Sequence, residues 1–357
     1  MWKQITVTAP GRICLFGEHQ DFLGLSVIAC AIDLGITIQA HPRPGGLMRV
    51  HLPDVGTVDE FAACDGRPPR HERDYLPSVV RVLRREGHEL PGLEAMVRGT
   101  IPINSGTASS SALVVAWTSL LLAVATGEAP DPVVVARLAH QSEVLEFDEP
   151  GGMMDHYTSA VGGLLHIDCG EPITVEPLPA QLEGFVLADS GVRKPTTSTL
   201  LHTRVTVRAA VETLQARHPE FNLRTTAWEE VAPLVEELPE AQRRPLRGQF
   251  VNRDLCREAR RMLGSGRVDP LRLGAMLLEH QRQLREAVEV SHPKLDELVA
   301  AAVAADALGG KLNGSGGGGA MFAYAPGRER EVAAALERAG GRSFLVSPHP
   351  GLQVEMD

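Results

Sequence analysis

The distribution of apolar residues along the first half of the chain predicts a domain that mixes β-strands with helices. Residues 1–9 and 25–40 are rich in Ile, Val, Thr and Ala, and turns rich in glycine and proline follow both stretches. An apolar helix is predicted from Ser109 to Thr126, where Gly127 ends it. The remaining elements expected in this half are strands at 93–101 and 161–169 and helices at 74–85 and 131–147.

The pattern changes near residues 170–184, which carry three prolines and predict a domain boundary. We therefore expect an N-terminal domain over 1–180 and a C-terminal domain over 181–357. The second half begins with a strand at 184–189 and then becomes mostly helical. Its predicted helices span 198–216, 226–238, 254–263, 270–289 and 293–308, and its predicted closing strands span 320–324, 343–346 and 352–356.

Composition narrows the class of protein. The chain has 357 residues, 43% of them hydrophobic, and a net charge of −10, which suits two packed domains and disfavours a broad nucleic-acid surface. Its longest apolar stretch, 112–125, is shorter than the roughly 20 residues that cross a membrane. The start lacks a secretory layout, and the five cysteines show no metal spacing. We expect a cytoplasmic protein without nucleic-acid or membrane partners, and its oligomeric state stays open.

Polar side chains that could take part in binding or catalysis lie between the first two predicted strands. Pro10-Gly11-Arg12 is followed closely by Glu18-His19-Gln20-Asp21, and glycine permits unusual backbone angles there. Loops on a rigid scaffold are where reactive groups concentrate, although a solvated turn has the same composition.

A second segment, Gly106-Thr107-Ala108-Ser109-Ser110-Ser111, leads into the long apolar helix. The start of such a helix presents free N–H groups and a positive dipole end, which together suit an anion. Three serines exceed what one helix cap needs, so phosphate binding is favoured over an ordinary Ser-rich cap.

Two further segments contain clustered glycines. Gly152-Met153-Met154-Asp155 places an acid after a glycine pair and follows a helix that carries Glu143. The run 314–319 indicates close approach of the backbone to another group, because so many glycines cost conformational entropy. Its G-x-G-x-x-G spacing is not taken as a dinucleotide fingerprint, since the preceding residues have a helical pattern and only 38 residues follow.

In this order, the segments resemble the motifs of the GHMP kinase superfamily, and within it the galactokinase-like sugar kinases. Residues 10–21 resemble the sugar-binding signature P-G-R-[VI]-x-L-x-G-E-H-x-D, and residues 102–112 resemble the phosphate-binding loop. Gly152 to Asp155 resembles the G-x-M-D motif, and the glycine run resembles the third motif. Residues 189–193 and 289–296 agree as well. The resemblance implies an α+β two-domain fold, with an N-terminal α/β domain, a C-terminal ferredoxin-like α/β domain and the active site between them.

The resemblance also implies roles for residues at matching positions. Asp155 would take or orient the proton of the attacking hydroxyl, and Arg12 would steady the transferring phosphoryl group. Ser111 and Glu143 would hold Mg²⁺. The sugar would contact Glu18, His19, Asp21 and Gly152, and the phosphates of ATP would contact Gly106, Thr107, Ala108, Ser109, Ser110 and Ser111.

The implied activity is transfer of the γ-phosphoryl group of ATP to a hydroxyl, the anomeric one in our prediction, of a galactose-related sugar or sugar acid. Departures from the family pattern at Leu23, His156 and Leu201 leave the identity of the sugar open. The alternatives are another substrate of the superfamily, such as mevalonate or a heptose phosphate, and a non-catalytic sensor of sugar and ATP. Packed donors and acceptors at Glu18, His19 and Asp21 favour a polyhydroxy substrate, and the presence of both Arg12 and Asp155 favours catalysis.

Overall fold

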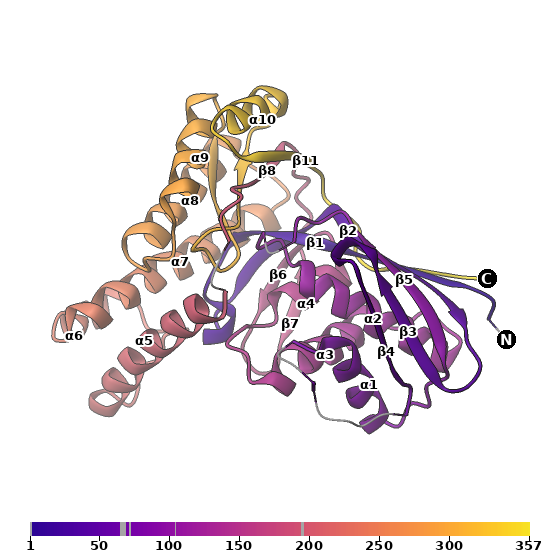
Figure 1. The fold of residues 1–357 in the computed structure, drawn as a ribbon. Helices are drawn as coiled ribbons and strands as arrows, with labels where there is room; N and C mark the ends of the chain where they lie inside the picture. Colours follow the sequence, from indigo (N-terminus) through magenta and orange to yellow (C-terminus); the bar gives the residue numbers. More distant parts are fainter. Residues whose placement is uncertain (1, 65–68, 71–72, 104, 194–195) are drawn as a thin grey trace.

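The computed structural model describes residues 2–64, 69–70, 73–103, 105–193 and 196–357. Two sheets, each covered by helices, lie next to each other (Figure 1). Asn104, in the segment that resembles a phosphate-binding loop, lies outside the described residues.

The first sheet is built around two long antiparallel strands, β1 (Ile5–Phe16) and β2 (Val27–Pro42). The order β12-β1-β2-β5-β3-β4 runs across it, and β6 pairs with the first residues of β2 and with β7. Only the β3–β5 pair is parallel among the described strands. The other members are β3 (Leu47–Leu52), β4 (Thr57–Ala62), β5 (Leu93–Gly99), β6 (Leu164–Asp168), β7 (Thr174–Pro177) and β12 (Gln353–Met356).

One face of this sheet is covered by α1 (Tyr75–Arg85), α2 (Ser109–Thr126), α3 (Pro132–Glu143) and α4 (Met154–Val161). The central helix α2 is apolar on all sides because sheet and helices surround it, and Trp117 is fully buried in its middle. By length and composition α2 is the one described helix that passes as a membrane span, yet two thirds of it is buried inside this layer.

The second sheet has the strand order β11-β8-β10-β9 and is antiparallel throughout. Its strands are β8 (Phe185–Asp189), β9 (Gly309–Asn313), β10 (Ala320–Tyr324) and β11 (Arg342–Val346). Helices precede β9 and follow β10, so the unit is a split β-α-β of the ferredoxin-like type. The predicted two-domain α+β fold is confirmed.

The helices of the second half fall into two groups. Three pack on the second sheet or its edge, namely α8 (Pro270–Glu286), α9 (Pro293–Ala304) and α10 (Glu329–Arg338). The other three are α5 (Thr196–Arg217), α6 (Trp228–Val235) and α7 (Glu240–Gly264). Figure 1 shows α5 and α6 projecting away from both sheets. Their shared apolar core reaches Leu25 near the start of β2, which ties this projection to the first sheet.

The last strand of the chain returns to the first sheet. Residues 353–356, which the predicted division assigns to the second domain, pair with Ile5 to Thr8 of β1. On the way back, the segment 347–349 exchanges main-chain hydrogen bonds with Ala31 and Asp33 of β2. The second sheet is therefore connected to the first at both of its ends.

Several predicted elements are confirmed, and others are wrong. Helix 109–126 and strand 320–324 have the predicted bounds. The helical pattern before the glycine run is wrong, because Gly309–Asn313 forms β9, whose pairing with β10 outweighs the weak strand preference of Gly-Gly-Lys. The dinucleotide motif is still excluded, since the run leads into a strand. Helix α7 begins at Glu240 rather than near 254, and the elements that the pattern missed are β3, β4, β7, α4 and α10.

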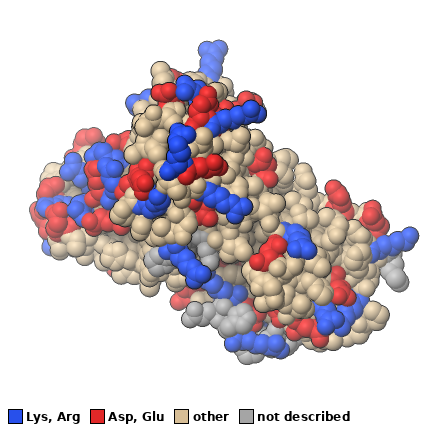
Figure 2. Space-filling view, turned by 45° about the horizontal axis from the view of Figure 1, so that its top comes forward, with Lys and Arg blue, Asp and Glu red and all other residues tan. Residues whose placement is uncertain are grey.

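Charged side chains of both signs are mixed on the surface. In the face shown in Figure 2, Lys and Arg lie among Asp and Glu rather than apart from them. Most of the arginines on α7 and α8 are paired with glutamates or aspartates on the same or a neighbouring helix, such as Arg272 with Glu258 at 2.6 Å.

Trp117 is expected to contribute strongly to the stability of the core between the first sheet and its helices. Its indole N–H donates to the carbonyl of Leu76 at 3.1 Å, and its ring meets Phe61 edge to face. Trp117→Ala should lower the free energy of unfolding by about 3–5 kcal/mol, because it leaves a large cavity. Chemical denaturation measures this loss. Trp117→Phe keeps most of the ring packing and should cost clearly less; equal losses for the two variants would contradict the cavity argument.

Candidate active site

Arg12 lies on β1 and reaches the start of α4. Its side chain is almost fully buried, and its Nε donates to Asp155 Oδ1 at 2.8 Å while Nη2 lies 2.7 Å from the same oxygen. Nη1 donates to the carbonyl of Gly106. Burial disfavours the charged guanidinium, but the carboxylates of Asp155 and Glu18 outweigh it, so the pKa of Arg12 is raised. The structure thus brings the two residues predicted to be catalytic into direct contact.

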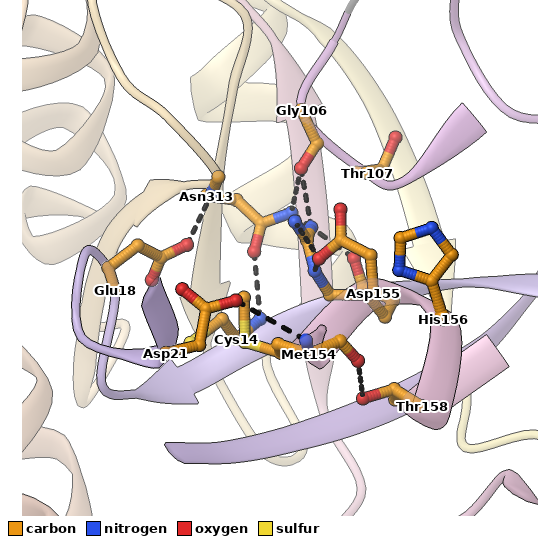
Figure 3. A network of polar contacts seen from close by, with 12 residues as sticks. Cys14, Glu18, Asp21, Gly106, Thr107, Met154, Asp155, His156, Thr158 and Asn313 are labelled. Carbon is orange, nitrogen blue, oxygen red and sulfur yellow. Dashed lines mark hydrogen bonds and ion pairs between the residues drawn. The ribbon is translucent and has the colours of Figure 1, made fainter. Parts of the chain in front are cut away.

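Asp155 keeps access to the cavity beside it. It lies in the first turn of α4, and its side chain is 27% exposed, whereas that of Arg12 is 3% exposed. Figure 3 shows Asp155 next to Gly106 and above Met154. A carboxylate near a helix N-terminus and bonded to a guanidinium is held in one orientation.

Asp21 approaches the same helix start from the opposite side. Its Oδ2 accepts from the Met154 N–H at 3.3 Å, and its Oδ1 accepts from the Phe22 N–H at 2.9 Å. A Cβ on Gly152 would lie 2.1 Å from the Asp21 carboxyl carbon, so only glycine fits there. Burial, together with the charge on Asp155, raises the pKa of Asp21 to about 6.

The predicted phosphate-binding segment forms a tight loop before α2. Gly106 and Ala108 both have positive φ, and α2 begins at Ser109 without a side-chain cap from the described residues. Its first N–H groups therefore face the cavity with no competing acceptor from a cap. Thr107 is buried and hydrogen-bonds Ser105, so its hydroxyl is turned into the loop rather than toward a ligand.

The two residues predicted to hold a metal, Ser111 and Glu143, both line the cavity. Glu143 Oε2 lies 2.7 Å from His156 Nε2, and both side chains are buried. His140 lies edge-on to His156, and burial together with that neighbour lowers the pKa of His140 to about 3, which keeps it neutral. No cluster of three or more His, Cys, Asp or Glu in the described part of the chain would hold a metal alone. One hydroxyl and one carboxylate suit Mg²⁺, which commonly keeps water and substrate phosphates as its other ligands.

The glycine run 314–319 packs against the phosphate-binding loop through backbone contacts. A Cβ on Gly314 would lie 2.6 Å from the Gly106 carbonyl oxygen, and one on Gly316 would lie 2.0 Å from the Val290 carbonyl oxygen. The Gly319 N–H donates to Val192, and the Ala320 N–H donates to Ser105. The run therefore joins the phosphate-binding segment to residues 189–193 and 289–296.

Glu18 and His19 are held mainly by the second sheet. Glu18 accepts from Lys311 Nζ and from the Gly314 N–H, and the Glu18–Lys311 pair is completely buried. His19 Nε2 lies 2.9 Å from the carbonyl oxygen of Ser315. Both were predicted to bind substrate, but each also joins the loop after β1 to the glycine run. Lys311 was missed as a functional residue because its partner lies 293 positions away.

These segments surround one cavity of about 370 Å³. Its inner end is polar, and its outer end, where the exposed Val55 and Ile103 lie, is mainly apolar apart from Asp54. The inner end is lined by Arg12, Glu18, His19, Asp21, Phe22, Gly152, Asp155, Leu200 and Ser315, and the outer end by Ile36, Leu52, Val55, Val97, Ile101 and Ile103.

The departures from the family motif fall at different distances from this cavity. His156 lines the cavity and contacts Glu143, which lines it as well. Leu201 is 48% exposed, and it is the preceding Leu200 that lines the cavity. Leu23 packs against the apolar core of α5 and α7. The shift from 201 to 200 depends on the orientation of α5, which the motif alone does not specify.

The contact between Gly152 and Asp21 can be tested by stability. Gly152→Ala should lower the free energy of unfolding by about 1–3 kcal/mol, because the new methyl group must displace a buried carboxylate. Thermal or chemical unfolding measures the change. Gly151→Ala is the matched control, since its Cβ would make only ordinary contact with Val144 at 3.7 Å. Similar losses for both variants would contradict the described packing of Asp21.

Comparison with known proteins gives consistent matches along the chain. The family model described as GHMP kinases N terminal domain matches residues 74–163, GHMP kinases C terminal matches 258–342, and the galactokinase galactose-binding signature matches 3–42. The chain is 30% identical to a mevalonate kinase of Pyrococcus horikoshii over 99% of both proteins. It is 32% identical to a galactokinase of a Roseiflexus species over 88% of this chain and 82% of that protein.

Among solved structures, the galactokinase of Lactococcus lactis complexed with galactose superimposes with a TM-score of 0.84 at 21% identity. The superposition covers 98% of this chain and 95% of that protein.

Proposed function

The chain belongs to the GHMP kinase family, and we propose that it transfers the γ-phosphoryl group of ATP to a hydroxyl, the anomeric one, of a neutral galactose-related sugar. The observation that carries this proposal is the Arg12–Asp155 pair at the inner end of a cavity that the uncapped start of α2 also lines. An anion-binding helix start and a hydroxyl-orienting carboxylate in one cavity suit phosphoryl transfer.

Phosphoryl transfer depends on positioning and charge stabilisation more than on covalent chemistry. The described contacts of Asp155 with Arg12 use Oδ1, which leaves Oδ2 for the proton of the acceptor hydroxyl. Arg12 is bonded to Asp155 and Gly106 at once, so its positive charge is fixed before substrate arrives. The Asp155 carboxylate then orients the hydroxyl, and Arg12 stabilises the charge that develops on the phosphoryl oxygens.

The donor set also fits a nucleotide with its metal. The mainly apolar outer end of the cavity suits the base of a nucleotide, and the first N–H groups of α2 suit its phosphates. Ser111 and Glu143 would hold Mg²⁺, which when bound neutralises phosphate charge. His156 holds one oxygen of Glu143 and so orients the other toward the cavity.

Charge balance at the inner end favours a neutral polyhydroxy substrate. Arg12 pairs with Asp155 and Lys311 pairs with Glu18, whereas the hydrogen bonds described for Asp21 come from backbone N–H groups. A carboxylate held in this way accepts hydrogen bonds from sugar hydroxyls and repels another carboxylate. The match to the galactose-binding signature and the identity with a galactokinase support the same substrate class.

Mevalonate is the second candidate, and the similarity of 30% over nearly the whole of a mevalonate kinase favours it. Glu18 is also paired with Lys311, so its presence is explained without a contact to a sugar hydroxyl. A mevalonate or uronic acid carboxylate would, however, bring a further negative charge into a cavity that Asp21 and Asp155 already line. A non-catalytic sensor of sugar and ATP is disfavoured because it needs no Arg12–Asp155 pair.

A substrate panel with Mg-ATP tests the proposal. Initial rates would be compared for galactose, arabinose, galacturonic acid, mevalonate and a heptose phosphate, with phosphorylated products identified by mass spectrometry. The highest kcat/KM is expected with a neutral sugar. Turnover confined to mevalonate or to an acid would overturn the substrate class, and no turnover with any compound would overturn the kinase assignment to these substrates.

Asp155→Asn separates chemistry from binding. We expect kcat to fall by about 10²–10⁴-fold while calorimetry still detects ATP and sugar, because the amide cannot take the proton. Asp168→Asn is the matched control, since Asp168 pairs with Arg224 at 2.7 Å outside the cavity. Near-normal turnover of Asp155→Asn would remove this carboxylate from the mechanism.

The raised pKa of Asp21, about 6, predicts a pH dependence of sugar use. As the pH falls through 6 the carboxylate gains a proton and loses acceptor strength, so KM for the sugar should rise toward about 10-fold per pH unit. Above pH 7 it should be constant. Steady-state kinetics of the wild type and Asp21→Asn between pH 5 and 8 measure this effect. The variant should lack the rise, and the same rise in both proteins would assign it to another group.

A further inference from the structure

Asn313 is the last residue of β9 and is completely buried between the two sheets. Its Oδ1 accepts from the Cys14 N–H at 2.9 Å. Its Nδ2 donates to the carbonyl oxygens of Arg12 at 3.2 Å and Gly106 at 3.1 Å. Figure 3 shows the Asn313 amide between Gly106 on one side and Cys14 on the other. One side chain from the second sheet thus contacts the backbones of β1 and of the phosphate-binding loop.

These contacts use both N–H groups of the amide and its oxygen. The Gly106 carbonyl accepts from Asn313 Nδ2 and also from Arg12 Nη1, so the two side chains share an acceptor. The main chain around Arg12 is held at two points, because Asn313 contacts both the Arg12 carbonyl and the N–H of Cys14. Movement of the Asn313 amide would therefore shift the guanidinium and the carbonyl against which it is aligned.

We propose that Asn313 is a positioning residue that aligns the Arg12 guanidinium with Asp155 and with the phosphate-binding loop. The proposal rests on the proposed phosphoryl transfer for its kinetic consequence. Its structural part, that one amide fixes the backbones of Arg12 to Cys14 and of Gly106, stands on the contacts alone. Asn313 touches neither proposed substrate and acts through Arg12.

The position of β9 does not depend on this amide. β9 pairs with β10 along its whole length, Leu312 N–H donates to Gln281, and Lys311 is bonded to Glu18, Cys14 and Leu312. Changing the Asn313 side chain should therefore alter the alignment of Arg12 more than the fold of the second sheet.

Three variants grade the effect. Asn313→Asp has the same shape but turns an acceptor toward two carbonyl oxygens, Asn313→Ala removes all three contacts, and Asn313→Ser keeps a hydroxyl that makes one or two. We expect kcat to fall by about 100-fold for the first two, because small misplacement of a transition-state group has costs of that size, and by less for the serine variant. KM for ATP and for the sugar should change by less than about 3-fold, since binding groups are retained.

Asn252→Ala is the control for deleting a buried amide. Asn252 is equally buried, and its amide has no hydrogen-bond partner in the described part of the chain. Unfolding temperatures of all four variants would be recorded, and kcat compared among those folded at the assay temperature. A loss of kcat in Asn313→Ala beyond that in Asn252→Ala, with partial rescue by Asn313→Ser, supports the proposal. Equal kcat in the two alanine variants overturns it.

Hydrogen exchange followed by mass spectrometry tests the alignment without any activity. Peptides covering 10–16 and 105–110 should exchange faster in Asn313→Ala than in the wild type and in Asn252→Ala. In the first peptide the Cys14 N–H loses its acceptor, and in the second the loop loses the contact that Asn313 makes with the Gly106 carbonyl. Unchanged exchange in both peptides overturns the positioning role. A wild type that turns over no panel compound but shows this exchange pattern would contradict the proposed function and leave the structural part of this inference supported.

Discussion

The site depends on the close approach of three backbones near Gly106. A Cβ on Gly11 would lie 2.6 Å from the carbonyl oxygen of Thr107, and one on Gly314 would lie 2.6 Å from that of Gly106. Main-chain bonds follow from this proximity, since the Arg12 N–H donates to Thr107. Side chains at these glycines would separate β1, the loop before α2 and the end of β9, and with them the groups that each carries.

Once the backbones are in contact, buried charges have to be balanced. The protein is acidic overall, yet Arg12 and Lys311, which are buried near the cavity, each face a carboxylate. Lys311 directs its ammonium at Glu18 and at two carbonyl oxygens, which satisfies all three of its protons. Solvent is excluded from the Glu18–Lys311 pair, which holds the loop after β1 against β9, whereas Asp155 keeps access to the cavity.

The sequence was a good guide to elements whose local signals agree with their surroundings. Helix 109–126 has an apolar interior and a glycine after its end, and its bounds are confirmed. The pattern failed where pairing decides the conformation, as in β9, whose glycines have little strand preference. The contact of Arg12 with Asp155 was expected only through resemblance to a family, because 143 positions separate them. Asn313 carried no signal, since its partners Arg12, Cys14 and Gly106 lie between 207 and 301 residues earlier.

The return of β12 to the first sheet affects how the protein can assemble during synthesis. β1 carries Arg12 and precedes the second sheet in the chain, but the strand that covers its outer edge follows the entire second sheet. Until then that edge has unpaired main-chain groups open to other nascent chains. Completion of the first sheet is therefore coupled to completion of the second, and a translation product that ends before β12 would expose an unpaired strand edge on the same strand that carries Arg12.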